Sequence, residues 1–239
     1  MLNLCRRIMP PVALALLLIS GFALRVGADT VNMELTGVNG VATDSIYVDP
    51  YSGTINGASA VLYCDDFTHD SSVGLTWTAD VTSYTQLALE DGSATNPWTV
   101  RFTTLPSNTY TENTVLQNYE AAGWLVQQMA ATTIGQKWSD YSFALWAIFN
   151  YAQVSTYDGF DSAAQGYYAA ALTFALTNPS LSDFAGLEIY TPANGQPSQE
   201  FITDPVAEPS SLVLVGLGLL MIVAVIRLRI TGPGLHPVG

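Results

Sequence analysis

The densest group of chemically capable side chains lies at residues 64–70, where the sequence reads CDDFTHD. Its carboxylates Asp65, Asp66 and Asp70 are oxygen ligands of the kind that a hard cation such as calcium prefers. They do not follow the Asp-x-Asp-x-Asp-Gly spacing of a calcium loop, so the alternative is an acidic edge where a strand passes into a loop. We keep these residues as candidate ligands and predict no metal site and no cofactor.

Two nucleophilic arrangements would use His69. A Cys64–His69 pair needs the imidazole against the sulfur, and five residues along a strand-to-turn path rarely achieve this. A serine triad would also need His69 as its base, yet the chain has no Gly-x-Ser-x-Gly elbow. Phosphate loops, dinucleotide fingerprints and His-Glu-x-x-His are absent as well. We predict that the protein is not an enzyme, with a secreted hydrolase using His69 as an alternative.

Charge is distributed unevenly along the chain. All 20 acidic residues lie between Asp29 and Glu208, where Arg101 and Lys137 are the only basic residues, so this stretch carries a net charge of 2 − 20 = −18. Such a charge argues against binding to nucleic acid or to anionic phospholipid. The simplest interpretation is a solvated acidic surface.

The N-terminal segment has the pattern of a signal peptide. Arg6 and Arg7 precede an apolar stretch, and residues 26–28 are the small residues that signal peptidase requires. We predict cleavage after Ala28, with an uncleaved anchor as the alternative. Once residues 1–28 are removed, Cys64 is the only cysteine left, so the core must hold by burial without an internal disulfide.

A second apolar segment lies near the C-terminus. Residues 210–226 carry no charge and as a helix would span about 25 Å, close to the thickness of a bilayer core. Arg227 and Arg229 follow this run, whereas Glu208 precedes it. The positive-inside rule therefore predicts a transmembrane helix over 210–230, a cytoplasmic tail over 231–239 and the main domain outside the inner membrane. A buried core helix is the alternative.

Between these segments, residue periodicity predicts an α+β domain over 29–194 and a stalk over 195–209. Apolar and polar residues alternate at 31–35 and at 75–81, and 60–64 is a short apolar run, so all three are predicted strands. We expect turns at 51–53 and 55–57, and a loop over 91–108 with one strand at 99–103.

Helical spacing begins after this loop. Apolar residues recur at intervals of three and four, predicting helices over 111–131, 138–151 and 162–176, the first capped by Thr111 or Asn113. Leu187, Ile189 and Phe201 suggest returning strands. Strands, then a block of about three helices, then strands are typical of an α+β fold with a β-rich body.

The C-terminal features occur in the order of a known sorting signal. Glu208-Pro209-Ser210, the apolar helix and the arginines resemble the PEP-CTERM family, whose members are exported by many Gram-negative bacteria that make exopolysaccharide. Ala207 stands where the family usually has its first proline, and residues 230–239 extend beyond its usual end. The resemblance implies processing by an exosortase-type membrane protease near this motif, followed by location at the cell surface or in the medium.

Motifs in the domain resemble the thioester-domain family of bacterial surface adhesins. They are residues 61–67 (VLYCDDF), 74–77, 121–125 and 143–146 (FALW). In that family a strand cysteine is joined covalently to a glutamine that precedes a triplet ending in Trp. Cys64 matches the cysteine, but Phe143 occupies the place of the glutamine and offers no carboxamide carbon for the sulfur to attack. The resemblance implies the fold rather than the thioester, and Cys64 is expected to be a small buried residue.

Together these observations predict an exported surface or extracellular-matrix protein with a structural or adhesive role. Its expected partners are signal peptidase, an exosortase-type protease, exopolysaccharide and the inner membrane, with no nucleic acid. A covalent adhesin whose thioester uses a different glutamine is an alternative. The sequence offers three glutamines near the FALW motif for that role, namely Gln127, Gln128 and Gln136.

Overall fold

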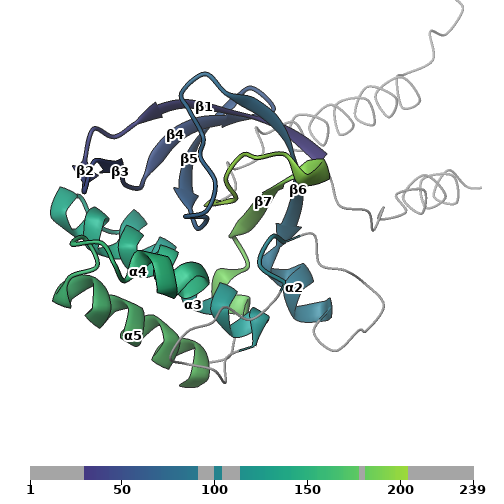
Figure 1. Ribbon diagram of the computed structural model, residues 1–239. Coiled ribbons are helices and arrows are strands. Elements are labelled where there is room, and N and C mark those ends of the chain that lie inside the picture. Colours follow the sequence, from purple (N-terminus) through teal and green to yellow (C-terminus); the bar gives the residue numbers. More distant parts are fainter. Residues whose placement is uncertain (1–29, 91–99, 104–113, 178–180, 204–239) are drawn as a thin grey trace, which may run out of the picture.

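The computed structural model describes residues 30–90, 100–103, 114–177 and 181–203 of the chain. A curved sheet closes into a barrel, and a layer of helices packs against one side of it (Figure 1). The predicted combination of a β-rich body with a block of helices is therefore confirmed. The predicted signal peptide, the transmembrane helix and the cytoplasmic tail lie outside the described residues.

The barrel consists of six antiparallel strands in the order β1-β4-β5-β8-β7-β6. It closes because β1 pairs with β4 on one side and with β6 on the other. A small ribbon of β2 and β3 lies outside the barrel. The strands are β1 (Thr30–Val38), β2 (Ala42–Thr43), β3 (Ile46–Tyr47), β4 (Tyr51–Ile55), β5 (Ala58–Cys64), β6 (Thr76–Ser83), β7 (Glu188–Pro192) and β8 (Phe201–Thr203).

Alternation along the strands fills the barrel interior. Met33 and Leu35 of β1 point inward together with Leu62 of β5, and all three are almost fully buried. Trp77 of β6 stacks on Phe201 of β8 with ring centroids 5.7 Å apart. The strands predicted at 31–35, 60–64 and 75–81 are thus confirmed, since one side of each is covered by this core.

The expected turn at 51–53 is wrong, because Tyr51–Ile55 forms the strand β4. Its Gly53 lies in the barrel wall, where no side chain would fit. The turn predicted at 55–57 is confirmed at its centre, where Asn56 and Gly57 both have positive φ angles of 50° and 82°. Two consecutive residues of this kind form the tight turn that suits the twist of a hairpin.

Between β6 and β7, the described residues form the α-helices α2 (Tyr84–Glu90), α3 (Val115–Ala130), α4 (Gly135–Val154) and α5 (Ser162–Thr177), followed by the 3₁₀ helix η1 (Leu181–Phe184). The predicted helices at 111–131, 138–151 and 162–176 correspond to α3, α4 and α5, whereas α2 was not expected. The N-cap of α3 is Thr114 rather than Thr111 or Asn113. Its hydroxyl accepts from the Gln117 backbone N–H, and the Gln117 side chain accepts from the Thr114 backbone N–H.

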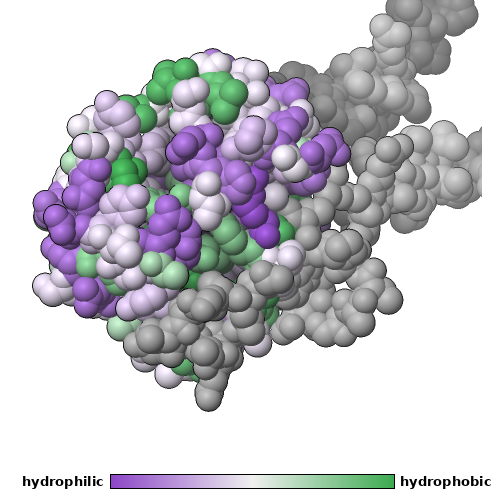
Figure 2. Space-filling model, in the orientation of Figure 1, coloured by the Kyte–Doolittle hydropathy of each residue, from purple (hydrophilic) through white to green (hydrophobic). Residues whose placement is uncertain are grey.

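A second hydrophobic core fills the space between the helices and the outer face of the barrel. Phe143 and Trp146 of α4 contribute to it, with Tyr63 and Ile202 from the barrel wall. On the face shown in Figure 2, hydrophilic and hydrophobic residues are interspersed. Among the described residues, no helix combines the length and the apolarity that crossing a membrane requires.

The domain continues past residue 194, where we predicted its end. Residues 201–203 form β8, which pairs with both β5 and β7 and so belongs to the barrel. The predicted strand at 99–103 is also wrong for its described part. The backbone N–H groups of Arg101 and Phe102 donate to the side chains of Glu200 and Tyr119 instead of to a neighbouring strand.

Replacing Gly53 with Ala is expected to destabilise the barrel. A Cβ at this position would lie 2.4 Å from Leu62 Cδ1 and 2.7 Å from the Glu34 carbonyl oxygen, and the backbone oxygen cannot move away freely. We expect a loss of about 1–3 kcal/mol in the free energy of unfolding, measured by urea unfolding. Gly37→Ala is the control, because its Cβ would only contact Ser52 Cβ at 3.7 Å. Equal losses in both variants would contradict this account.

Candidate functional site

Cys64 ends β5 at the junction between the barrel and the helices. Its side chain is fully buried in the barrel core, and its thiol donates to the Asp66 carbonyl oxygen at 3.2 Å. The indole N–H of Trp146, from α4, donates to the Cys64 carbonyl oxygen at 2.8 Å. Burial raises the pKa of the Cys64 thiol, and the nearby carboxylates raise it further. Cys64 is thus a protonated, buried thiol, as expected for a structural residue.

Asp49 holds the backbone of Cys64 from the other side. Its Oδ1 accepts the Cys64 backbone N–H at 2.6 Å, and its own backbone N–H donates to Ser142 Oγ at 3.0 Å. The Asp49 side chain is fully buried, and burial raises its pKa to about 7. No local sequence pattern indicates this residue, because only the tertiary structure brings it to the end of β5.

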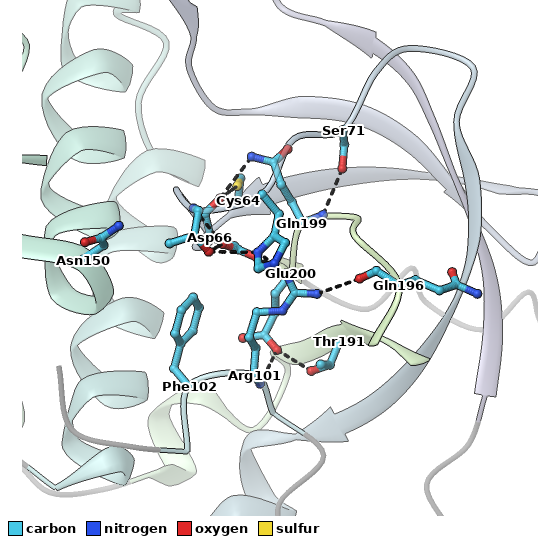
Figure 3. Close-up of polar contacts among 12 residues, drawn as sticks. Cys64, Asp66, Ser71, Arg101, Phe102, Asn150, Thr191, Gln196, Gln199 and Glu200 are labelled. Atoms are coloured by element: carbon cyan, nitrogen blue, oxygen red, sulfur yellow. Dashed lines mark hydrogen bonds and ion pairs between the residues drawn. The ribbon is translucent and has the colours of Figure 1, made fainter. Parts of the chain in front are cut away.

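The fully buried Asp66 carboxylate is the centre of an ionic cluster (Figure 3). Its Oδ2 forms an ion pair with the Arg101 guanidinium and contacts His69 Nδ1 at 2.9 Å. Its Oδ1 accepts from the backbone and hydroxyl of Thr68 at 2.9 Å and 2.6 Å. Arg101 also donates to the Gln196 carbonyl oxygen at 3.3 Å. These contacts neutralise the Asp66 charge and join three separate segments of the chain.

Asp65 and Glu200 form a second buried acidic pair beside this cluster. Glu200 accepts hydrogen bonds from the Tyr119 hydroxyl at 2.6 Å, from the Arg101 backbone at 2.8 Å and from the Thr191 hydroxyl. No described residue donates to either oxygen of Asp65. Burial raises the pKa of Asp65 well above its ordinary value, and the charges of Glu200 and Asp66 add to this. Burial also raises the pKa of Glu200, so this pair favours the protonated form more than exposed carboxyl groups do.

The candidate metal ligands are not assembled into a cation site. Asp66 is paired with Arg101 and His69, Asp65 is buried beside Glu200, and Asp70 is exposed. In the part of the chain that the structure describes, no group of three or more His, Cys, Asp or Glu residues is arranged to hold a metal ion.

The structure separates Cys64 from His69 and from Phe143. The His69 imidazole contacts Asp66 and Arg101 through Nδ1, so it belongs to the ionic cluster. Phe143 is fully buried and packs against Trp146 with ring centroids 5.1 Å apart. Its ring lies directly against Gly159, where an added Cβ would meet the ring at 2.4 Å. Phe143 thus fills the helical core at the position that the resemblance assigned to glutamine.

A different glutamine lies close to Cys64. The Gln199 side chain donates through Nε2 to the Asp66 carbonyl oxygen at 3.1 Å, which is the same atom that accepts from the Cys64 thiol. By contrast, Gln127 donates to the Asp183 carbonyl oxygen and Gln136 to Asp140. Gln199 was missed because it precedes no aliphatic-Trp motif. The signal that could have found it is the pairing of Phe201 with Cys64, which follows if β8 adjoins β5.

The expected solvated acidic surface is only partly correct. The structure buries six carboxyl side chains, those of Asp49, Asp65, Asp66, Glu120, Asp140 and Glu200. The negative charge of the surface is therefore smaller than the sequence count suggests. Comparisons with protein-family models, curated proteins and solved structures found no match to this chain.

Asp49→Asn is expected to change how stability depends on pH. The folded state keeps the Asp49 proton up to about pH 7, whereas the unfolded chain releases it near the ordinary pKa of 3.8. Between these values the folded state binds more protons, so the free energy of unfolding falls as pH rises. Between these two pKa values, the titration of Asp49 changes the free energy of unfolding by an amount on the order of 4 kcal/mol. The free energy of unfolding of the variant should therefore fall less steeply with rising pH than that of the wild type.

Urea unfolding at about pH 4 and about pH 8 measures this difference. Asp70→Asn is the control because it changes an exposed carboxylate in the same region. A wild-type pH dependence in the Asp49→Asn protein would contradict the assignment.

Proposed function

We propose that this protein is an exported, membrane-anchored surface or matrix protein with a structural or adhesive role and no catalysis. The observation that carries the proposal is that the side chains capable of chemistry make structural contacts with one another and with the core. Asp66, Arg101 and His69 bind one another, and the Cys64 side chain is enclosed in the barrel core while Trp146 binds its carbonyl oxygen. The Trp146 contact joins the barrel to α4, and the ionic cluster joins the end of β5 to two loops, a use that suits a rigid domain displayed outside the cell.

The ends of the chain support the proposed location. The signal-peptide pattern at 1–28 directs the chain across the inner membrane, and the apolar run with Arg227 and Arg229 would stop it there. Signal peptidase then acts at Ala28, and an exosortase-type protease acts near Glu208-Pro209-Ser210. In this proposal the domain is released to the cell surface or to an exopolysaccharide matrix.

Two epitope tags on one chain test this processing. One tag follows Ala28 and the other follows Gly239, and cells are separated into medium, surface, membrane and cytosol. We expect the first tag at the surface or in the medium and the second in the membrane, because cleavage lies between them. Replacing Glu208 and Pro209 with Ala should keep both tags in the membrane. Both wild-type tags in the cytosol would refute export.

A second candidate function is that of a covalent adhesin, and the position of Gln199 is the observation that favours it. The Cys64 thiol and the Gln199 carboxamide converge on the Asp66 carbonyl oxygen at 3.2 Å and 3.1 Å. Attack of the sulfur on the carboxamide carbon would form a C–S bond and break the C–N bond. The thiol proton would leave with the nitrogen as ammonia, and the resulting thioester could acylate an amine on a partner.

Intact mass after treatment with methylamine tests this candidate. If the thioester forms, the untreated protein weighs one ammonia less than its sequence requires, and methylamine adds its own mass. Gln199→Ala should abolish both changes, whereas Gln127→Ala should keep them, because Gln127 lies at Asp183. An untreated mass equal to the sequence mass, unchanged by methylamine, would exclude the thioester.

A further inference from the structure

We propose that a polar groove on the barrel binds a neutral saccharide unit of a matrix polysaccharide. This deepens the proposed adhesive function by naming a class of ligand. The groove has a volume of about 470 Å³, within the range of about 300–1,000 Å³ that is usual for small-molecule sites. Its polar lining comes from β1, β4, β6 and the segment after β7, namely Asn32, Glu34, Thr54, Thr76, Thr78 and Gln196.

Strand register explains why these side chains gather. Glu34 of β1 lies opposite Thr54 of β4 and opposite Thr76 of β6. Asn32 lies opposite Thr78 in the adjacent row. Neighbouring residues of these strands fill the barrel core, so side-chain alternation directs the polar ones outward. Three neighbouring strands thus present a continuous polar surface.

The two sides of the groove have different origins. On one side, Gly57 of the β4–β5 turn has no side chain, which leaves space beside Thr54. On the other side is Gln196, which follows the short 3₁₀ helix Ala193–Gly195 after β7. The Gln196 carbonyl oxygen accepts from Arg101, and the amide end of its side chain points away from Arg101 (Figure 3). The Arg101 side chain of the ionic cluster therefore fixes the backbone of a groove residue.

The chemistry of the lining favours a neutral, hydroxyl-rich ligand. Three threonine hydroxyls and two carboxamides can each donate and accept, and the Glu34 carboxylate accepts only. A sugar ring presents hydroxyl groups that match this mixture. Among the described lining residues, Glu34 is the only charged one and is negative, so it would repel uronic acids and phosphorylated sugars.

Native affinity electrophoresis of the full chain in mild detergent tests the proposal. The gels contain dextran, hydroxyethylcellulose, galactomannan or xyloglucan as neutral probes and alginate as an anionic probe. We expect at least one neutral polysaccharide to retard the protein and alginate to have no effect. Thr76→Trp would fill the groove and should raise the apparent Kd by about tenfold or more.

Thr36→Trp is the matched control, because Thr36 is exposed on β1 and lies outside the lining. Tryptophan is accepted on exposed strand positions, so both variants should fold. The inference is overturned if no neutral polysaccharide retards the wild type, if both variants bind equally well, or if alginate binds more strongly. The tag experiment tests export and processing, whereas the gels test saccharide binding. Either proposal can fail while the other holds, so the two experiments distinguish them.

Discussion

The structure depends on the ion pair between Asp66 and Arg101 in a buried position. Asp66 lies two residues after the end of the barrel strand β5, whereas Arg101 lies in the connection between α2 and α3. A buried carboxylate is tolerated only when a charge and hydrogen bonds replace the lost water. Arg101 meets this need. Its backbone N–H also donates to Glu200 and its side chain to the Gln196 carbonyl oxygen, so Arg101 holds the connection between β7 and β8 against the segment after β5.

Around this pair, the junction between barrel and helices is more polar than either core. The Trp146 indole, the Asp49 carboxyl and the Tyr119 hydroxyl all hydrogen-bond to groups at the ends of β5 and β8. These contacts have fixed directions, whereas the apolar cores on both sides would tolerate some sliding. Directional bonds therefore set the orientation of the helical layer on the barrel, and hydrophobic burial holds the two together.

Local periodicity was enough to predict the elements that bury one face. The strands β1 and β6 alternate cleanly because one side meets the barrel interior. The helices α3 to α5 show helical spacing because they pack against one another and contribute to the second hydrophobic core. The strand β4 was mistaken for a turn because its Ser52 and Gly53 are typical turn residues. Gly53 is there because the barrel wall leaves no space for a side chain. The Asp65–Glu200 pair and the proximity of Gln199 to Cys64 arise from long-range pairing, which no local pattern encodes.

The barrel is discontinuous in the chain, and this order determines when it can close. Strands β1, β4, β5 and β6 precede the whole helical block, and β7 and β8 follow it. Until the last two strands arrive, β5 and β6 have unpaired edges. Such distant pairings form slowly, and exposed edges invite association with other chains. A chain that crosses a membrane from its N-terminus would therefore first form an open sheet of β1, β4, β5 and β6. The barrel would close only when β7 and β8 pair with β6 and β5.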